Sequence, residues 1–397
     1  MSSPSRPLAA GLVARLVVIA SVLILQACAT SQSITTARDQ FRHGSTDAAL
    51  QTLSEADVSN RDKLLLLLDT ALVAQAAGRY EQSIVAFEDA YKLIEKLDYI
   101  SARDQSAALV TSDWAIRYSG EFSERLWIHT FQMINYLLLD QPGGAAVEAR
   151  RAVALYKKHG DVLDNDLFTR YLMALSFESA GQLDSAMVEY RKLEKELEPD
   201  AFRTRHSSSR ELTVLVATGF IEPKQPGDLF IDINARVSFP YYPDVYERAP
   251  DIEVIADKKS LKATRVDTRL LSIAQDALAK RGKTIASRHA LRLAAKYSLA
   301  QSIEEQDPLA GGLARLFLLA LEQADTRSWE TLPAYLSLVR VKIPTDLTSV
   351  NIRIEAADSS HSNFERRTVQ FDLDEGGNQF RMIRIGVQDS QQQVVNQ

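Results

Sequence analysis

A pattern that repeats after 34 residues constrains the fold of this chain more than any other feature. The segment Gly44–Ala56 aligns with Gly78–Ala90, and the alignment places Ala49 over Ser83 as well as glycine over glycine. Glycine often ends a helix because it adopts a left-handed backbone conformation without strain. A small residue five positions later lets two paired helices approach closely. The offset therefore predicts stacked pairs of antiparallel helices.

A later copy extends this pattern through the first half of the chain. It begins at Gly181, has Ala186 at the small-residue position, and is followed by Pro199 where the second helix should stop. The pattern as a whole resembles tetratricopeptide repeats over residues 33–199, with an interruption from 97 to 121. A helical array without a true repeat is the alternative interpretation.

A degenerate copy lies between the clear ones. We expect its two helices at 122–139 and 144–158, because apolar residues recur there at helical spacing. The segment Gln141–Gly144 contains proline and two glycines and is the expected break. Ala146 then stands at the small-residue position.

The second half of the chain has a different pattern, which begins after a polar, aperiodic stretch at 201–209. Short runs of β-branched and alternating apolar residues predict strands at 211–218, 251–256, 334–341, 349–354, 368–373 and 380–385. Helical spacing predicts helices at 268–280, 284–304 and 309–323. We expect Asp374–Asn378 to join the last two strands as a hairpin.

These patterns predict an α+β fold. A tetratricopeptide-like α-helical repeat array forms the N-terminal part, and a C-terminal domain with an antiparallel sheet or sandwich and a helical insertion follows it. The predicted division is a signal peptide at 1–27, the helical repeat domain at 28–200 and the mixed α/β domain at 201–397.

The first 27 residues have the features of a removable signal peptide. Arg6 and Arg15 supply positive charge, an apolar run extends over 16–25, and Ala27 is the small residue before cleavage. The run is shorter than the roughly 20 apolar residues of a membrane span. Cys28 follows at once.

The sequence Leu25–Cys28 resembles the lipobox of bacterial lipoproteins. The resemblance implies a diacylglycerol on the Cys28 thiol, cleavage before Cys28 and acylation of the new amine. Ala29 and Thr30 follow instead of the aspartate that commonly retains enterobacterial lipoproteins at the inner membrane. We therefore expect a lipid anchor in the outer membrane, on its periplasmic face. An ordinary signal peptide with an unrelated cysteine is the alternative.

Composition argues against several other classes of protein. The chain has 46 Lys and Arg against 52 Asp and Glu, and this negative balance disfavours nucleic acid as a partner. Its one cysteine rules out a disulfide framework, and its six histidines show no two-histidine metal spacing. Arg281–Thr284 resembles the end of a phosphate loop, but Ala277 occupies the place of the first glycine. We expect neither a metal nor a cofactor.

Several segments have a further likeness, which covers most of the mature chain. They are Tyr118–Arg125 with His129, Asn135–Leu137, Val147–Arg151, Gly219–Lys224, Ala290–Tyr297 and Asp325–Pro333. Together they resemble a family of uncharacterised bacterial lipoproteins that join a tetratricopeptide-like half to a mixed α/β half. The resemblance implies an envelope lipoprotein encoded near other lipoproteins that build outer-membrane assemblies, and it implies no reaction.

Glu124, Arg125 and His129 form the best candidate polar cluster. Glu124 and Arg125 open a predicted helix, and His129 follows four or five residues later. A carboxylate, a guanidinium and an imidazole can support acid and base catalysis if facing residues converge on them. A capping glutamate, a buried ion pair and a core histidine explain the same residues without catalysis. We favour the structural interpretation and assign no catalytic residue.

The aromatic and proline-rich segment Phe239–Tyr246 contains candidate partner-binding residues. Tyr241, Tyr242 and Tyr246 suit contact with a peptide or a sugar. Covering an edge strand is the other reading of this segment, and the sequence leaves both open.

The favoured function is a non-catalytic scaffold or adaptor for an envelope or secretion assembly. Tetratricopeptide arrays bind peptides or helices in their concave face, and they need no reactive centre to do so. The alternative is an enzyme that acts on cell-wall or exported polysaccharide. It requires paired carboxylates at a cleft between the two halves.

Overall fold

The structure is a computed structural model of the whole chain. It describes residues 32–103, 117–194, 210–232, 235–245, 248–282, 298, 301–302, 304–305, 312, 323–357, 364–374 and 377–386. Cys28, Tyr246, the boundary at 201–209 and most of the two helices predicted within 284–323 lie outside these residues. None of the helices in the described ranges is long and apolar enough to cross a membrane.

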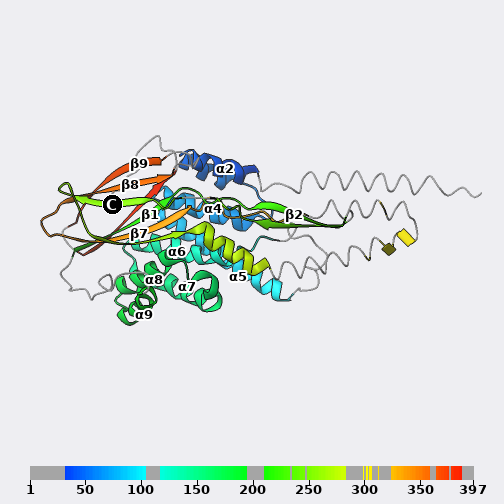
Figure 1. Cartoon of the computed structure of the whole chain (residues 1–397), viewed down its shortest axis with the longest axis horizontal. Helices are drawn as coiled ribbons and strands as arrows, with labels where there is room; N and C mark the ends of the chain where they lie inside the picture. The colour runs from blue at the N-terminus through cyan, green and yellow to red at the C-terminus, as the bar shows by residue number, and fades with distance from the viewer. Residues whose placement is uncertain are drawn as a thin grey trace, which may run out of the picture.

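The N-terminal half consists of consecutive antiparallel helix pairs (Figure 1). The pairs are α2 (Gln32–Arg42) with α3 (Thr46–Glu55), α4 (Lys63–Ala76) with α5 (Tyr80–Arg103), α6 (Phe122–Leu138) with α7 (Pro142–Leu163), and α8 (Leu167–Ser179) with α9 (Leu183–Leu193). The predicted helices at 122–139 and 144–158 correspond to α6 and α7.

Each pair turns through one residue in the left-handed conformation. The four turn residues have positive φ and are Gly44, Gly78, Asp140 and Gly181. In each turn, this residue donates its N–H to the carbonyl three residues back, and the next residue donates to the carbonyl five residues back. Common hydrogen bonding therefore ends the first helix of every pair.

The small residue five positions after each turn is buried, and Ser83 faces the next helix pair, where its hydroxyl accepts a hydrogen bond from Asn135 of α6 at 2.9 Å. Ala49, Ser83 and Ala186 are all buried, as the 34-residue alignment predicts. In the degenerate copy the turn residue is Asp140, so the equivalent position is Ala145 rather than Ala146. The proline and glycines at 142–144 belong to the start of α7, where proline fits because its missing N–H is not needed.

In the described residues of the C-terminal half, the strands form two four-stranded sheets and a separate hairpin. The strands are β1 (Arg210–Thr218), β2 (Gln225–Asp232), β3 (Ala235–Tyr241), β4 (Asp251–Ala256), β5 (Lys259–Ser260), β6 (Ala263–Arg269), β7 (Tyr335–Ile343), β8 (Ser349–Ala357), β9 (Phe364–Asp372) and β10 (Asn378–Ile385). The strand orders are β10-β1-β7-β6 and β5-β4-β8-β9. The structure is thus mixed α and β, as predicted.

The predicted hairpin through Asp374–Asn378 is wrong. β9 pairs with β8 in one sheet, whereas β10 pairs in parallel with β1 in the other. The sequence expectation of an antiparallel sheet also fails at this parallel pair. All nine residues of β1 are buried, so β1 needs a hydrogen-bonded neighbour on each side, and β10 provides the second one. Turn residues alone did not show this longer-range pairing.

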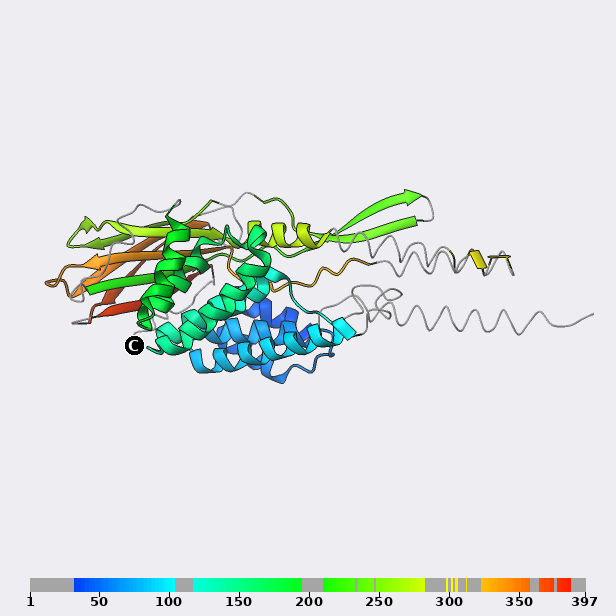
Figure 2. The same ribbon diagram turned by 90° about the horizontal axis from the view of Figure 1, so that it is seen from below.

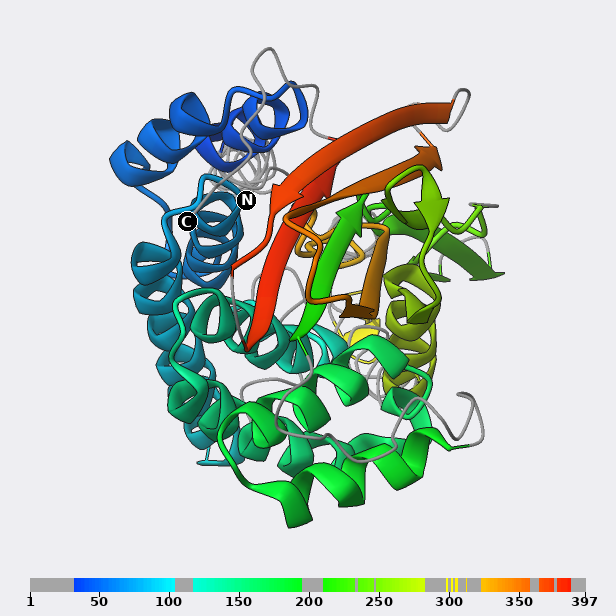
Figure 3. The ribbon, with the colours of Figure 1, turned by 90° about the vertical axis from the view of Figure 1, so that its left-hand side faces the viewer.

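β1 contacts a different hydrophobic core on each face. Leu212, Val214 and Val216 join the core between the two sheets. Leu215 and Ala217 point the other way and join the core shared with the helices. Figure 3 shows the helices as an arc around the sheets. The helical half and the first sheet therefore share one hydrophobic core across the predicted domain boundary.

Two elements in the second half position the residues described below. A helix over residues 270–282 follows β6 directly, slightly later than the predicted 268–280. The paired strands β2 and β3 extend away from the rest of the molecule, as Figure 2 shows, and we call them the arm.

Candidate functional site

The segment 325–334 from the second half contacts the first helices of three pairs, α2, α4 and α6, which we call the inner helices. At its centre, the Trp329 side chain is fully buried, and its ring meets Phe87 and Phe131 edge-on at 5.8 Å. The Trp329 backbone N–H donates to Glu124 at 2.9 Å, and its indole N–H donates to Thr331 Oγ1 at 2.9 Å. The segment 325–334 thus packs against the helices of the arc.

A buried arginine connects this segment to two helices. Arg38 of α2 contacts Asp69 of α4 at 2.7 Å and Glu330 at 2.7 Å. Its third donor reaches the Ser328 carbonyl at 2.9 Å. Burial raises the pKa of Asp69, and Arg38 opposes this only in part. The Asp69 carboxylate also accepts a hydrogen bond from Thr331 at 2.8 Å.

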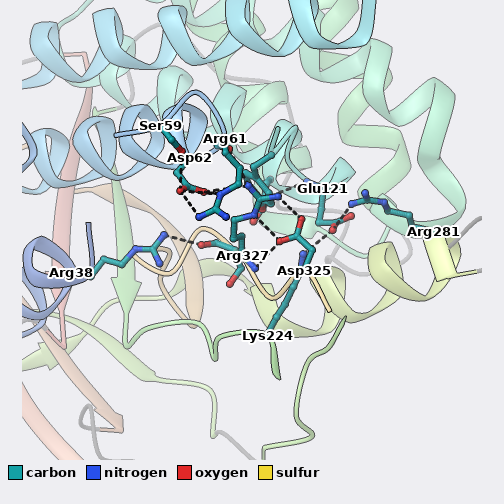
Figure 4. Close-up of polar contacts among 12 residues, drawn as sticks. Arg38, Ser59, Arg61, Asp62, Glu121, Lys224, Arg281, Asp325 and Arg327 are labelled. Atoms are coloured by element: carbon teal, nitrogen blue, oxygen red, sulfur yellow. Dashed lines mark hydrogen bonds and ion pairs between the residues drawn. The ribbon is translucent and has the colours of Figure 1, made fainter. Parts of the chain in front are cut away.

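A second arginine, Arg327, fixes the start of the same segment (Figure 4). Its guanidinium contacts Asp325 at 2.7 Å and Asp62 at 3.2 Å, and it donates to the Arg61 carbonyl at 3.0 Å. The guanidinium also lies 5.5 Å from the centre of the Tyr118 ring. These contacts connect the loop before α4 with the segment 325–334.

Glu121 lies at the start of α6 and receives two cations from the second half. Lys224 Nζ lies 2.7 Å and Arg281 Nη1 lies 2.8 Å from Glu121 Oε1, as Figure 4 shows. Burial raises the pKa of Glu121, but the two cations outweigh burial and lower this pKa to about 2. Lys224 Nζ lies 5.9 Å from the Tyr118 ring centre and 5.7 Å from that of Tyr242.

Glu124 binds three donors beside this ion pair. Its carboxylate accepts hydrogen bonds from the Glu121 N–H at 2.8 Å, from the Tyr118 hydroxyl and from the Trp329 N–H. Burial and the charges of Glu124 and Glu121 raise the pKa of Tyr118 well above its usual value. The phenol therefore remains a donor at neutral pH.

The predicted polar cluster does not converge. Arg125 points away from Glu124 to Asp98, which is half exposed, with a 2.6 Å contact. His129 is buried and lies 2.7 Å from Glu148 on α7. Arg125 is therefore not the partner of a buried carboxylate. The non-catalytic interpretation of the sequence, which predicts a buried ion pair for Arg125, is wrong on this point. Glu124, Arg125 and His129 contact three different neighbours.

The candidate partner-binding tyrosines differ in exposure. Tyr241 is exposed on β3, and its hydroxyl donates to Gln225 at 3.2 Å. Tyr242 is buried beside Lys224. Tyr246 lies outside the described residues. The two described tyrosines therefore do not form one exposed surface.

We call the place where the segments 118–125, 219–224 and 325–333 meet the junction. Its carboxylates are paired with cationic side chains. Glu121, Asp62 and Asp69 each face lysine or arginine side chains instead of a second carboxylate. A glycoside hydrolase requires two carboxylates on either side of the scissile bond. Within the described part of the chain, no group of three or more His, Cys, Asp or Glu side chains is placed to hold a metal ion.

The sequence indicates Glu124 as a candidate, but it does not indicate most of the charged residues that lie around Glu124 in the structure. The missed residues are Arg38, Asp69, Glu121, Lys224, Arg281 and Arg327. One signal was present, because three segments with the family resemblance, 118–125, 219–224 and 325–333, meet at this junction. Each of the three segments contains charged residues and an aromatic residue.

Comparison with known proteins found no family model, no curated protein and no solved structure that matches this chain. The resemblance to envelope lipoproteins therefore stays a prediction from the sequence.

Proposed function

We propose that the protein is a lipid-anchored scaffold on the periplasmic face of the outer membrane, where it holds another envelope protein. The lipobox-like sequence ending at Cys28 supports the anchor. The four helix pairs with a common turn support a tetratricopeptide-like array. No reaction is part of this proposal.

The inner face of the helical array is not the binding surface in this proposal. Tetratricopeptide arrays commonly bind a peptide there. In this chain the segment around Trp329 occupies that place, and α8 packs against β6 and β7. A partner therefore has to bind an outer surface.

The observation that carries the proposal is a set of exposed valines at equivalent positions. Val85, Val147 and Val188 each stand seven residues after the turn residue of their pair. Their side chains are 62%, 41% and 49% exposed. Stacked repeats place equivalent positions in a row along one side of the array. We call these three residues the valine row.

A regular row differs from scattered apolar residues, which are normal on a protein surface. The second helices α5, α7 and α9 each contribute one valine, so a partner contacting all three spans three helix pairs. Apolar contact of this kind needs no deep pocket. The valine row therefore fits an adaptor that holds an apolar surface of an envelope protein.

Replacing Val147 by glutamate tests this proposal. We expect Val147→Glu to reduce the co-purification of crosslinked partner from native membranes at least tenfold, because a charge is introduced at the centre of the row. Stability should change little, since the side chain is exposed. Leu183→Glu is the matched control, as Leu183 is 61% exposed and lies outside the row. Equal recovery of partner with both variants would contradict the proposal.

A further inference from the structure

The arm exposes large apolar side chains at a distance from the core. Leu229 and Phe230 are 58% and 66% exposed. β2 and β3 pair with each other and with no other described strand. A two-stranded hairpin with this much exposed apolar surface is marginally stable in water. An apolar environment would therefore stabilise the exposed end of the arm.

The base of the arm is firmly held. Phe239 stands opposite Gly227 and covers it so closely that an added Cβ would lie 2.8 Å from the ring. The Ala324 N–H donates to Ser238 at 3.2 Å. Lys224 and Tyr242, which flank the arm in sequence, belong to the buried junction. The arm is thus a fixed projection.

The apolar residues of the arm lie on both of its faces. Neighbouring residues of a strand point in opposite directions, so Leu229 and Phe230 face opposite sides. A flat protein surface would cover one side and leave the other in water. Immersion in lipid covers both. The arm ends near Asp232, so a shallow position at the headgroup level fits best.

The N-terminal end of α2, which follows the predicted lipid anchor in sequence, lies towards the same side (Figure 1). Three residues lie between Cys28 and Gln32, where α2 begins, so the two Cα atoms are at most roughly 14 Å apart. In Figure 1 the N-terminal end of α2 faces the side towards which β2 extends. An acyl chain on Cys28 therefore brings the bilayer to the side of the molecule that carries the arm.

We propose that Leu229 and Phe230 insert into the same membrane leaflet that holds the acyl chains on Cys28. This inference rests on the lipid anchor of the proposed function. The arm then acts as a second contact with lipid and fixes the orientation of the scaffold relative to the membrane.

A single labelled cysteine tests the insertion. Because acylated Cys28 leaves no other thiol, Phe230→Cys in the lipidated chain accepts one environment-sensitive fluorophore. We expect the label in phosphatidylethanolamine and phosphatidylglycerol vesicles to shift to shorter emission wavelength. We also expect at least twofold quenching by lipids with a nitroxide near the headgroup. Val188→Cys on α9 is the control and should show neither effect.

Two outcomes would overturn the arm proposal alone. One is a label at 230 that behaves like the label at 188 in vesicles. The other is a label at 230 that is shielded in native envelope membranes but not in pure lipid, because this outcome would indicate a protein partner. Palmitate incorporation reports on the anchor separately. A chain without palmitate would overturn both the anchor and the inference that rests on it.

Discussion

At the scale of single residues, the buried ion pairs determine how the two halves of the chain meet. Glu121 is the clearest case, because Lys224 and Arg281 both reach one of its oxygens from elements more than a hundred positions away. Removing one partner of a buried pair typically costs several kcal/mol, because the other charge stays buried. The contacts of Glu121 with Lys224 and Arg281 therefore hold the start of α6 against the segments that carry these two cations.

The lowered pKa of Glu121 predicts a loss of stability in acid. Its carboxyl titrates near 4.5 when unfolded and at about 2 when folded. Its contribution, about 3 kcal/mol, is therefore complete above pH 4.5 and is lost as the pH falls towards 2. Asp69 has a raised pKa and contributes with the opposite sign, so the intact chain must be compared with Glu121→Gln.

Denaturant unfolding of both proteins between pH 6 and pH 2.5 measures this difference. We expect the free energy of unfolding of Glu121→Gln to depend less steeply on pH below 4.5. Parallel curves for the two proteins would show that the charge of Glu121 is not stabilised by Lys224 and Arg281.

At the scale of elements, one turn of the helical array departs from the others. Gly44, Gly78 and Gly181 adopt positive φ without strain, but Asp140 has φ 53° and carries a Cβ. A non-glycine residue in this conformation costs about 1 to 2 kcal/mol. The third helix pair therefore keeps the common turn in spite of its sequence.

Replacing Asp140 by glycine should stabilise the protein. We expect Asp140→Gly to raise the free energy of unfolding by about 1 kcal/mol, because the turn is retained and the strain is removed. Gly78→Asp should lower it by a similar amount at the equivalent turn. The test is a pair of denaturant titrations. A destabilised Asp140→Gly would indicate that the aspartate side chain stabilises this turn.

Local patterns determined how much of the fold could be predicted. The helix pairs were predictable because Gly44 and Gly78 recur at the repeat period. The strands β1, β4, β7 and β8 were predictable from β-branched apolar runs. β6 was missed because its sequence, from Ala263 to Arg269, is largely polar. The position of β10 depends on β1, which is distant in sequence, so local turn chemistry gave the wrong partner.

At the scale of the whole molecule, the segment around Trp329 connects the halves that the sequence predicts as separate domains. Its ring packs edge-on against the stacked rings of Phe87 and Phe131, and its backbone N–H donates to Glu124. The sequence could not show this, because an aperiodic segment carries no sign of which helices it will contact. For the same reason, Glu124 could be selected as a candidate but its neighbours Lys224 and Arg327 could not.

Trp329→Ala should destabilise both halves together. Removing a fully buried tryptophan typically costs about 3 to 5 kcal/mol. We expect loss of the helical circular dichroism signal and loss of hydrogen-exchange protection in β1 at the same denaturant concentration. Helices that unfold while the β1 amides stay protected would show that the halves are independent.

The function that we propose is that of a lipid-anchored scaffold that binds its partner through the valine row. The most direct test is photo-crosslinking in cells with a photoreactive residue at position 147 of the intact, lipidated chain. We predict a crosslinked protein product in the outer-membrane fraction, and its absence when the photoreactive residue stands at position 183. An outer-membrane chain that yields no product at 85, 147 or 188 would contradict the account.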